Sequence, residues 1–157
     1  MDKPIISGKE RDIVRLFDMC MKAGKNECLD DGIPLNVLDT VVYEMAFKFG
    51  RADIVVFHID GSASIIEVKD GTKGYNHVVA GIGQAALYAS QLALNKGSLT
   101  KVRKCLLWTS TGNAWADQFI EFACLTAKCV PLPWGALSDH LKAEREVLAS
   151  FAEKVVS

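Results

Sequence analysis

Two short apolar segments on either side of Asp60-Gly61 constrain the fold of this chain more than any other feature. Residues 51–59 and 63–69 each have the length and the content of β-branched residues that are typical of a buried strand. An Asp-Gly pair between two such segments is a strong signal for a β-hairpin. The sequence therefore predicts two adjacent antiparallel strands, against which the rest of the chain must pack.

Glu67 and Lys69 place two charges within the second of these segments. Residues two apart on a strand project from the same face, so these side chains lie together while Ile66 and Val68 point the other way. A buried charge without a partner destabilises a fold by roughly several kcal/mol, so we expect a compensating partner, a metal or a ligand. Asp53, at the start of the first strand, is the natural companion carboxylate.

The length of the hairpin loop decides whether Asp53 and Glu67 can meet. A two-residue turn would place Asp53 on the opposite face of the sheet, whereas a three-residue loop over 60–62 pairs Asp53 with Lys69 and makes Asp53 and Glu67 diagonal neighbours. We therefore expect an odd loop or a bulge. Two converging carboxylates repel each other, and a divalent cation would keep both ionised. Carboxylate oxygens suit Mg²⁺ or Mn²⁺ rather than Zn²⁺.

The remaining segments alternate between helical and extended patterns. The predicted helices cover about residues 8–23, opened by a capping box of Ser7 and Glu10, residues 77–94, capped by Asn76, residues 113–128, and a last helix capped by Ser138. The stripe expected to be buried on the second helix is Val78, Val79, Ile82, Ala86 and Ala89. Further strands are predicted within 38–49 and at 102–109, with a short edge strand at 130–133 that contains two prolines.

This order predicts an α/β fold in which a mixed central sheet is flanked by helices, with an α-β-β-β-α-β core. The 157 residues fit a single domain, with a core over about 8–110 and a C-terminal extension over about 111–157.

Composition restricts the compartment and the partners of the chain. The 18 basic and 19 acidic residues give a net charge of −1, so contact with nucleic acid requires a local patch, for which residues 96–104 offer four basic side chains. The five cysteines show no zinc-ligand spacing, and no segment has the length and apolarity of a membrane span. We expect a soluble, intracellular protein in a reducing compartment, with structural roles for His58, His140 and the three tryptophans.

The sequence contains Asp53 and, after thirteen intervening residues, Glu67-Val68-Lys69 between apolar flanks. This pattern resembles the core motif of the PD-(D/E)XK nuclease superfamily. The predicted element order is similar to the restriction-endonuclease-like fold of that superfamily. Gln84-Ala-Ala-Leu-Tyr88 is similar to the Gln-x-x-x-Tyr element of its helicase-associated exonucleases, and Glu10 is similar to the helix-one glutamate of archaeal Holliday junction resolvases. The resemblance covers about residues 8–110, and Ala52 stands where the motif has proline.

The resemblance implies a metal-dependent deoxyribonuclease that hydrolyses DNA phosphodiester bonds by direct water attack, as a homodimer. It implies Mg²⁺ (or Mn²⁺) as cofactor, DNA as partner and no membrane association. The residues that it implies are Asp53, Glu67 and Glu10 as metal ligands, Asp53, Glu67, Lys69 and Gln84 in catalysis, and Lys73, His77 and Tyr88 in nucleic-acid contacts.

Several alternatives stay open at this point. Glu67 and Lys69 could form an exposed charge ladder with Asp53, Glu10 could act only as a cap, and Glu44 is a rival third carboxylate. The polar positions of the 77–94 helix could be its solvated face. The chain could also be a non-catalytic nucleic-acid- or protein-binding module on the same fold, or an unrelated α/β domain. The sequence leaves DNA versus RNA, and endonuclease versus exonuclease, undecided.

Overall fold

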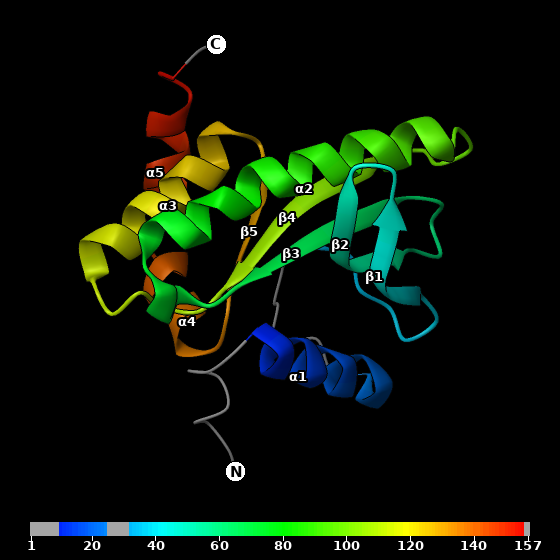
Figure 1. The fold of residues 1–157 in the computed structure, drawn as a ribbon. Coiled ribbons are helices and arrows are strands. Elements are labelled where there is room, and N and C mark those ends of the chain that lie inside the picture. Colours follow the sequence, from blue (N-terminus) through cyan, green and yellow to red (C-terminus); the bar gives the residue numbers. More distant parts are fainter. Residues whose placement is uncertain (1–9, 25–31, 156–157) are drawn as a thin grey trace.

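Five strands form one mixed sheet with helices on both of its faces in the computed structural model, which describes residues 10–24 and 32–155 (Figure 1). The strands are β1 Thr40–Phe47, β2 Gly50–Phe57, β3 Ala63–Lys69, β4 Val102–Trp108 and β5 Val130–Pro133. The helices are α1 Glu10–Ala23, α2 Tyr75–Asn95, α3 Ala114–Thr126, α4 Ala136–Lys142 and α5 Arg145–Ala152, with a 3-10 turn, η2, at Gly71–Lys73. The predicted α/β class and mixed sheet are confirmed.

The strands lie in the sheet in the order in which they occur in the chain. β1, β2 and β3 form an antiparallel meander, whereas β3–β4 and β4–β5 are parallel pairs. Parallel neighbours require a crossover connection, and α2 and α3 supply these two crossovers. β5 lies at the edge as predicted, because its prolines cannot donate hydrogen bonds to a further strand.

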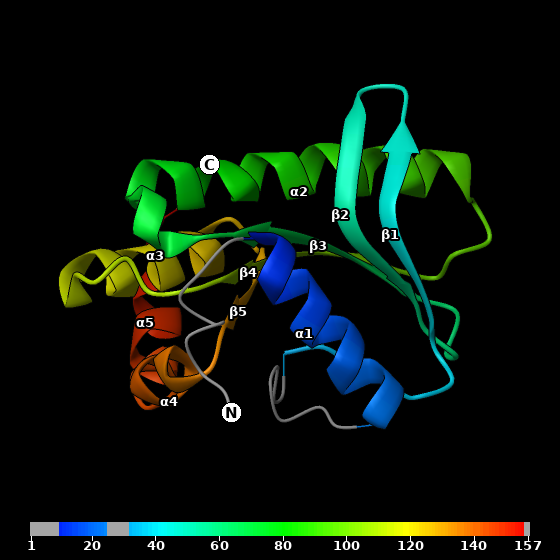
Figure 2. The same cartoon turned by 60° about the horizontal axis from the view of Figure 1, so that its bottom comes forward.

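The sheet separates two layers of core residues, each of which is covered by helices (Figure 2). On one face, α1 buries Ile13 and Phe17 among apolar side chains that include Ile54 of β2 and Leu107 of β4. On the other face, α2 and α3 cover the sheet, and Leu92 of α2 is fully buried. Residues that alternate along β2, β3 and β4 thus serve opposite layers, as the two-residue period of a strand requires.

The buried face of α2 differs from the predicted one. α2 begins at Tyr75 after Gly74, not after an Asn76 cap, and its buried residues share only Val78 and Ala89 with the predicted stripe. The full buried set is Val78, Gly81, Ala85, Tyr88, Ala89 and Leu92. The sequence does not determine which face of this helix is buried, because small and apolar residues occur all round it and give little amphipathic contrast.

The C-terminal third also departs from the expectation. The single predicted last helix is two, α4 and α5, and Ser138 lies within α4 instead of capping it. Trp108 and Trp134 are buried, but Trp115 is 70% exposed. Ser7 and Cys28 lie outside the described residues; the four described cysteines are free, and no described helix could cross a bilayer.

Phe17→Ala should lower the free energy of unfolding by about 3 to 5 kcal/mol, because the fully buried ring joins α1 to the sheet and its loss leaves a cavity. Met19→Ala on the same helix is the matched control, since Met19 is 59% exposed and its truncation should cost less than about 0.5 kcal/mol. Urea denaturation followed by circular dichroism measures both. Equal effects of the two substitutions would contradict the packing of α1 described above.

Candidate functional site

A split between β2 and β3 creates the candidate site. β2 pairs with β1 from Gly50 to Phe57 with a gap at Asp53, but with β3 only from Ile54 to Phe57. The β1–β2 hairpin therefore rises away from the rest of the sheet, as Figure 1 shows. The split begins beside Asp53, so that the backbone groups of β3 at Glu67 and Val68 face no ladder partner on β2.

The connection between β2 and β3 is an odd loop, as predicted. His58 N–H donates to the Ser62 carbonyl at 2.8 Å, which leaves residues 59–61 as a three-residue loop instead of 60–62. The Asp60 carboxylate fixes this turn by accepting hydrogen bonds from the backbone N–H and the hydroxyl of Ser62. The register is shifted accordingly. Its continuation puts Asp53 opposite Glu67, and the predicted pairing of Asp53 with Lys69 is wrong.

Two carboxylates accept hydrogen bonds from backbone N–H groups where the β2–β3 ladder is missing. The backbone N–H of Asp53 donates to Oε2 of Glu67 at 3.0 Å, and the backbone N–H of Val68 donates to Oδ2 of Asp53 at 2.8 Å. Each carboxylate thus takes the place that a strand carbonyl would have in a regular sheet. Asp53 and Glu67 converge in the split, as the sequence predicted.

Burial and mutual repulsion shift the protonation of this pair. Burial, followed by the nearby Asp53 charge, raises the pKa of Glu67 to about 8. Burial also raises the pKa of Asp53, and the charge of Glu10 acts in the same direction. The two carboxyl groups hydrogen-bond to each other, so without a cation the pair retains one proton near neutral pH.

Lys69 lies beside the pair and is almost buried, with 9% of its surface exposed. Its positive charge favours ionisation of both Asp53 and Glu67 by lowering their pKa values against the effect of burial. Its aliphatic stem runs over Gly81 of α2, where an added Cβ would lie 3.1 Å from Cγ and 3.2 Å from Cε of Lys69. Gly81 therefore provides the space that the lysine occupies, a role that the sequence analysis missed. A glycine inside a predicted helix was the available signal.

Glu10 approaches the pair from the first residue of α1. Its Oε2 accepts hydrogen bonds from the Asp70 backbone N–H at 2.9 Å and from His77 Nε2 at 2.5 Å, and its Oε1 lies 3.9 Å from Lys73 Nζ. Burial acts to raise the pKa of Glu10, but these hydrogen bonds outweigh it and the pKa is lowered. Glu10 is thus an ionised carboxylate beside the site, held by His77 and Lys73, two of the three residues predicted to contact nucleic acid.

Glu44, the rival third carboxylate, lies elsewhere. It is exposed and forms an ion pair with Arg51 at 3.0 Å. Its φ of 51° marks a local distortion of β1 at the point where neither Glu44 nor Asp53 takes part in the β1–β2 ladder. The structure therefore brings Glu10, and not Glu44, towards the converging pair.

Gln84 has a polar atom without a partner among the described residues, whereas Tyr88 packs in the core. Oε1 of Gln84 is buried and has no hydrogen-bond partner among the described residues, one turn after Gly81 on α2. The ring of Tyr88 stacks on Phe47 with centroids 6.0 Å apart and packs against Gly50, so it supports the hairpin from within the core. Tyr88 is therefore placed to hold β1 and β2 over α2, and offers little surface for a strand of nucleic acid.

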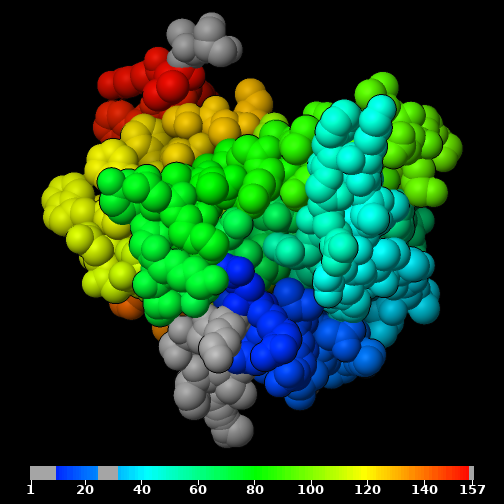
Figure 3. Space-filling view, in the orientation of Figure 1, coloured from blue at the N-terminus to red at the C-terminus, as the bar shows by residue number. Residues whose placement is uncertain are grey.

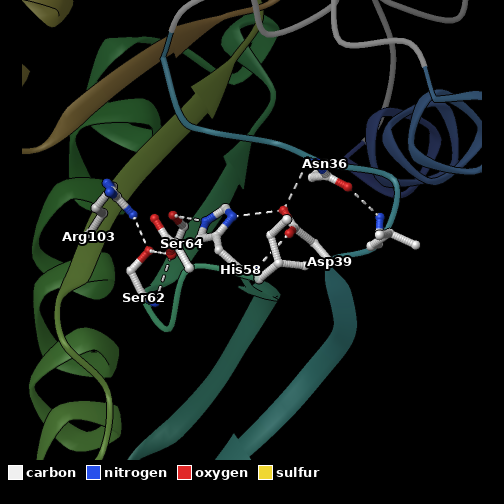
Figure 4. Close-up of polar contacts among 9 residues, drawn as sticks. Asn36, Asp39, His58, Ser62, Ser64 and Arg103 are labelled. Atoms are coloured by element: carbon white, nitrogen blue, oxygen red, sulfur yellow. Dashed lines mark hydrogen bonds and ion pairs between the residues drawn. The ribbon is translucent and has the colours of Figure 1, made fainter.

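A second polar cluster joins Asp39, His58 and Ser64 (Figure 4). His58 Nδ1 lies 2.8 Å from Asp39 Oδ2, and His58 Nε2 lies 2.8 Å from Ser64 Oγ. The order of the three side chains is that of a hydrolase triad, but Ser64 is fully buried within β3 and no substrate could reach it. Asp39 also accepts hydrogen bonds from the backbone N–H groups of Asn36 and Ile59, so the cluster fastens the hairpin end to the segment before β1.

The donor set at the split consists of oxygen atoms. Among residues 10–24 and 32–155, no three side chains of His, Cys, Asp or Glu are grouped as they would be around a metal ion, so the converged unit is the pair Asp53 and Glu67. Two carboxylates that cannot both ionise unaided fit a hard divalent cation, which binds oxygen ligands and often retains water molecules. Comparisons with known proteins found no family model, curated protein or solved structure that matches this chain.

The stability of the metal-free protein should fall as pH rises from about 4.5 to about 8. Glu67 takes up its proton at about pH 8 when folded, against an ordinary value of 4.5, so the folded state binds more protons than the unfolded state between these values. Glu67→Gln should remove this slope, and its stability advantage over the wild type should therefore grow with pH. Urea denaturation across this range in the presence of a chelator measures the difference.

Glu44→Gln is the matched control for that experiment, because its carboxylate is exposed, and its curve should run parallel to that of the wild type. A difference between Glu67→Gln and the wild type that stays constant from pH 4.5 to 8 would show that the carboxyl pair does not share a proton.

Proposed function

We propose that this protein is a Mg²⁺- or Mn²⁺-dependent nuclease of the PD-(D/E)XK type that hydrolyses phosphodiester bonds in DNA. The observation that carries the proposal is the convergence of Asp53 and Glu67 in the split between β2 and β3, with Lys69 beside them. The order α1-β1-β2-β3-α2-β4 supports it, because it is similar to that of the restriction-endonuclease-like fold.

Asp53 and Glu67 would hold the cation, and Glu10 would join them through a water molecule. When bound, the cation would polarise the phosphodiester and lower the pKa of a coordinated water molecule. The charge of Glu10 is already present at neutral pH, because His77 and the Asp70 backbone stabilise it.

Lys69 supplies the positive charge that offsets negative charge developing on the phosphate oxygens. Its near-complete burial strengthens this effect, because charges interact more strongly where water is excluded. The contact with Gly81 restricts the stem, so that the ammonium group is positioned before the substrate arrives. The free Oε1 of Gln84 can accept a hydrogen bond from Lys69 or from the attacking water molecule.

The surroundings of the pair support a polymeric substrate. The space-filling surface is indented between α2 (green), the β1–β2 hairpin (cyan) and the start of α1 (blue), as Figure 3 shows. Lys73 is exposed at the rim on η2 and can reach a phosphate, as can His77 when a substrate competes for it. DNA is favoured over other phosphodiesters here by the resemblance of the motif.

DNA cleavage should require Mg²⁺ or Mn²⁺ and should be lost in Glu67→Gln and Lys69→Met, each by at least about 100-fold in rate, because the first substitution removes a ligand of the cation and the second removes the positive charge beside the phosphate. The assay uses labelled linear, flapped and four-way DNA with gel separation of products. Lys48→Met is the matched control, because Lys48 is exposed in the β1–β2 turn and should leave the rate unchanged.

Metal-independent binding of DNA without cleavage would contradict the enzyme and select a non-catalytic module. Cleavage that persists in Glu67→Gln would contradict the site. Circular dichroism of each variant separates lost activity from lost folding.

Mn²⁺ should raise the thermal midpoint of the wild type near pH 8, because a bound cation allows Asp53 and Glu67 to ionise in the folded state. Asp53→Asn should reduce this gain strongly, whereas Glu44→Gln should retain it. Differential scanning fluorimetry over a series of Mn²⁺ concentrations measures the shift without reference to activity. Equal shifts in Asp53→Asn and the wild type would place the cation elsewhere.

A further inference from the structure

A basic hollow of about 550 Å³ lies between the second half of α2, the start of β4 and the end of α3. The residues that line it include Ala86 and Ala93 of α2, Lys101 just before β4, Lys104 within β4, and Lys128 after α3. Sites for small molecules commonly have volumes of about 300 to 1,000 Å³, so the basic hollow has the size of such a site.

The basic hollow is separate from the carboxylate pair. β3 pairs with β4 in parallel from Ala63 opposite Val102 to Lys69 opposite Trp108. Lys101 therefore lies at the opposite end of these two strands from Lys69, roughly 20 Å along the sheet. No residue that lines the basic hollow takes part in the split between β2 and β3.

The charge around the basic hollow has a single sign. Among the described residues, its lining contains four cations and neither Asp nor Glu. One of the cations, Arg103, donates to Ser62 Oγ at 2.8 Å in the hairpin loop (Figure 4). Within residues 10–24 and 32–155, no carboxylate forms an ion pair with Lys101, Lys104 or Lys128. A cleft lined by unpaired charges of one sign concentrates ligands of the opposite sign.

Lys128 has a backbone conformation that usually belongs to glycine. Its φ is 56°, its N–H donates to the Leu125 carbonyl at 3.3 Å, and the Cys129 N–H donates to the Cys124 carbonyl at 2.8 Å. These hydrogen bonds form the Schellman motif that ends α3, in which glycine is common because a left-handed conformation disfavours a Cβ. A lysine at this position destabilises the helix end, and an anionic ligand that needs its charge would explain why it is there.

Lys104 is a second cation that the packing does not explain. It lies on the α2 side of β4 between Val102 and Leu106, and it pairs with Ile65 of β3. Ile65 and Leu106 are fully buried in the apolar core, whereas Lys104 is half-buried. A half-buried charge among apolar side chains is unfavourable unless a partner compensates it. An anion in the basic hollow would be such a partner.

Small residues on α2 leave the space for a ligand. Ala86, Ala89, Ser90 and Ala93 all line the basic hollow, and their spacing places them on one side of the helix. The cations reach this space from before β4, within β4 and after α3, so they converge on one point instead of following a line across the surface. That arrangement favours a compact polyanion over the extended backbone of a nucleic acid.

We propose that the basic hollow binds a small molecule that carries a polyphosphate chain. The ammonium groups of Lys101, Lys104 and Lys128 would neutralise the chain and donate charge-assisted hydrogen bonds to its oxygen atoms. The alanine side of α2 would lie against the rest of the molecule. This site does not depend on the proposed nuclease activity, because it shares no residue with the carboxylate pair.

Isothermal titration calorimetry with ATP and with inorganic tripolyphosphate tests the proposal, at about 0.1 M salt to screen weak surface attraction and with a chelator to remove divalent cations. We expect a dissociation constant below about 100 μM for at least one of the two probes. Equal affinities would identify the polyphosphate chain as the whole ligand, and tighter binding of ATP would add its nucleoside. Absence of binding by both probes at about 1 mM would overturn the proposal.

Lys104→Met and Lys128→Gly should each weaken binding by about 10- to 100-fold, because each removes one charge-assisted interaction. Lys128→Gly should also raise the thermal midpoint by about 2 to 4 °C, since glycine suits the left-handed position. A gain in stability together with a loss of binding separates a ligand contact from a structural role. Lys48→Met is the matched control, because Lys48 is exposed in the β1–β2 turn and should not affect binding.

Ala93 allows a test that changes charge alone. Ala93 is exposed on α2, so both Ala93→Glu and Ala93→Gln should fold, which circular dichroism verifies. Ala93→Glu should weaken binding by at least about 10-fold by placing a negative charge in the basic hollow, whereas Ala93→Gln should retain it. Equal effects of the two substitutions would contradict an anionic ligand at this position.

Two further measurements distinguish the basic hollow from the proposed nuclease site. Glu67→Gln should bind the probes as the wild type does, and loss of binding in Glu67→Gln with retention in Lys104→Met would place the ligand at the carboxylate pair and overturn the proposal. Short duplex DNA should not displace the bound probe. Displacement by duplex DNA would make the basic hollow part of a nucleic-acid surface, which would also overturn the proposal.

Discussion

The structure depends on the way β2 leaves β3. Where the backbone ladder stops, Asp53 and Glu67 accept the hydrogen bonds that strand carbonyls would otherwise accept. The fold thereby loses regular strand pairing and buries two carboxylates, both of which are unfavourable. The raised pKa of Glu67 reflects the unfavourable burial. Two buried acids that share one proton are stabilised by a nearby positive charge, so the proposed cation would link the stability of the fold to its own binding.

The elements around the split act together to keep it open. Tyr88 of α2 stacks under Phe47 and fits against Gly50, so α2 holds the β1–β2 hairpin away from the rest of the sheet. About two helical turns before Tyr88, Gly81 lets α2 approach β3 closely enough to enclose Lys69. The small residues of α2 have two consequences: Gly81 allows this close contact, and the alanines of the second half leave room for the basic hollow.

Sequence reasoning reached the hairpin and the convergence of Asp53 with Glu67 because both follow from the two-residue period of a strand and from loop length. It missed the register by two residues, because the three-residue loop covers 59–61 and not 60–62, with the Asp60 side chain accepting hydrogen bonds from Ser62. It also gave the wrong buried face for α2 and did not predict that Trp115 is exposed, because local apolarity does not say which side of a helix the sheet will contact.

The sequence by itself determined the α/β class, the succession of elements from α1 to β5 and the two strands that carry Asp53, Glu67 and Lys69, because strand period and turn chemistry are local properties. Only the tertiary structure decided that Glu10 and not Glu44 reaches the pair, that Gly81 makes room for Lys69, and that α3 turns its aromatic rings outwards. Each of these depends on contacts between residues distant in the chain, such as Glu10 with His77 and Glu121 with Arg145, and no local pattern of residues encodes them.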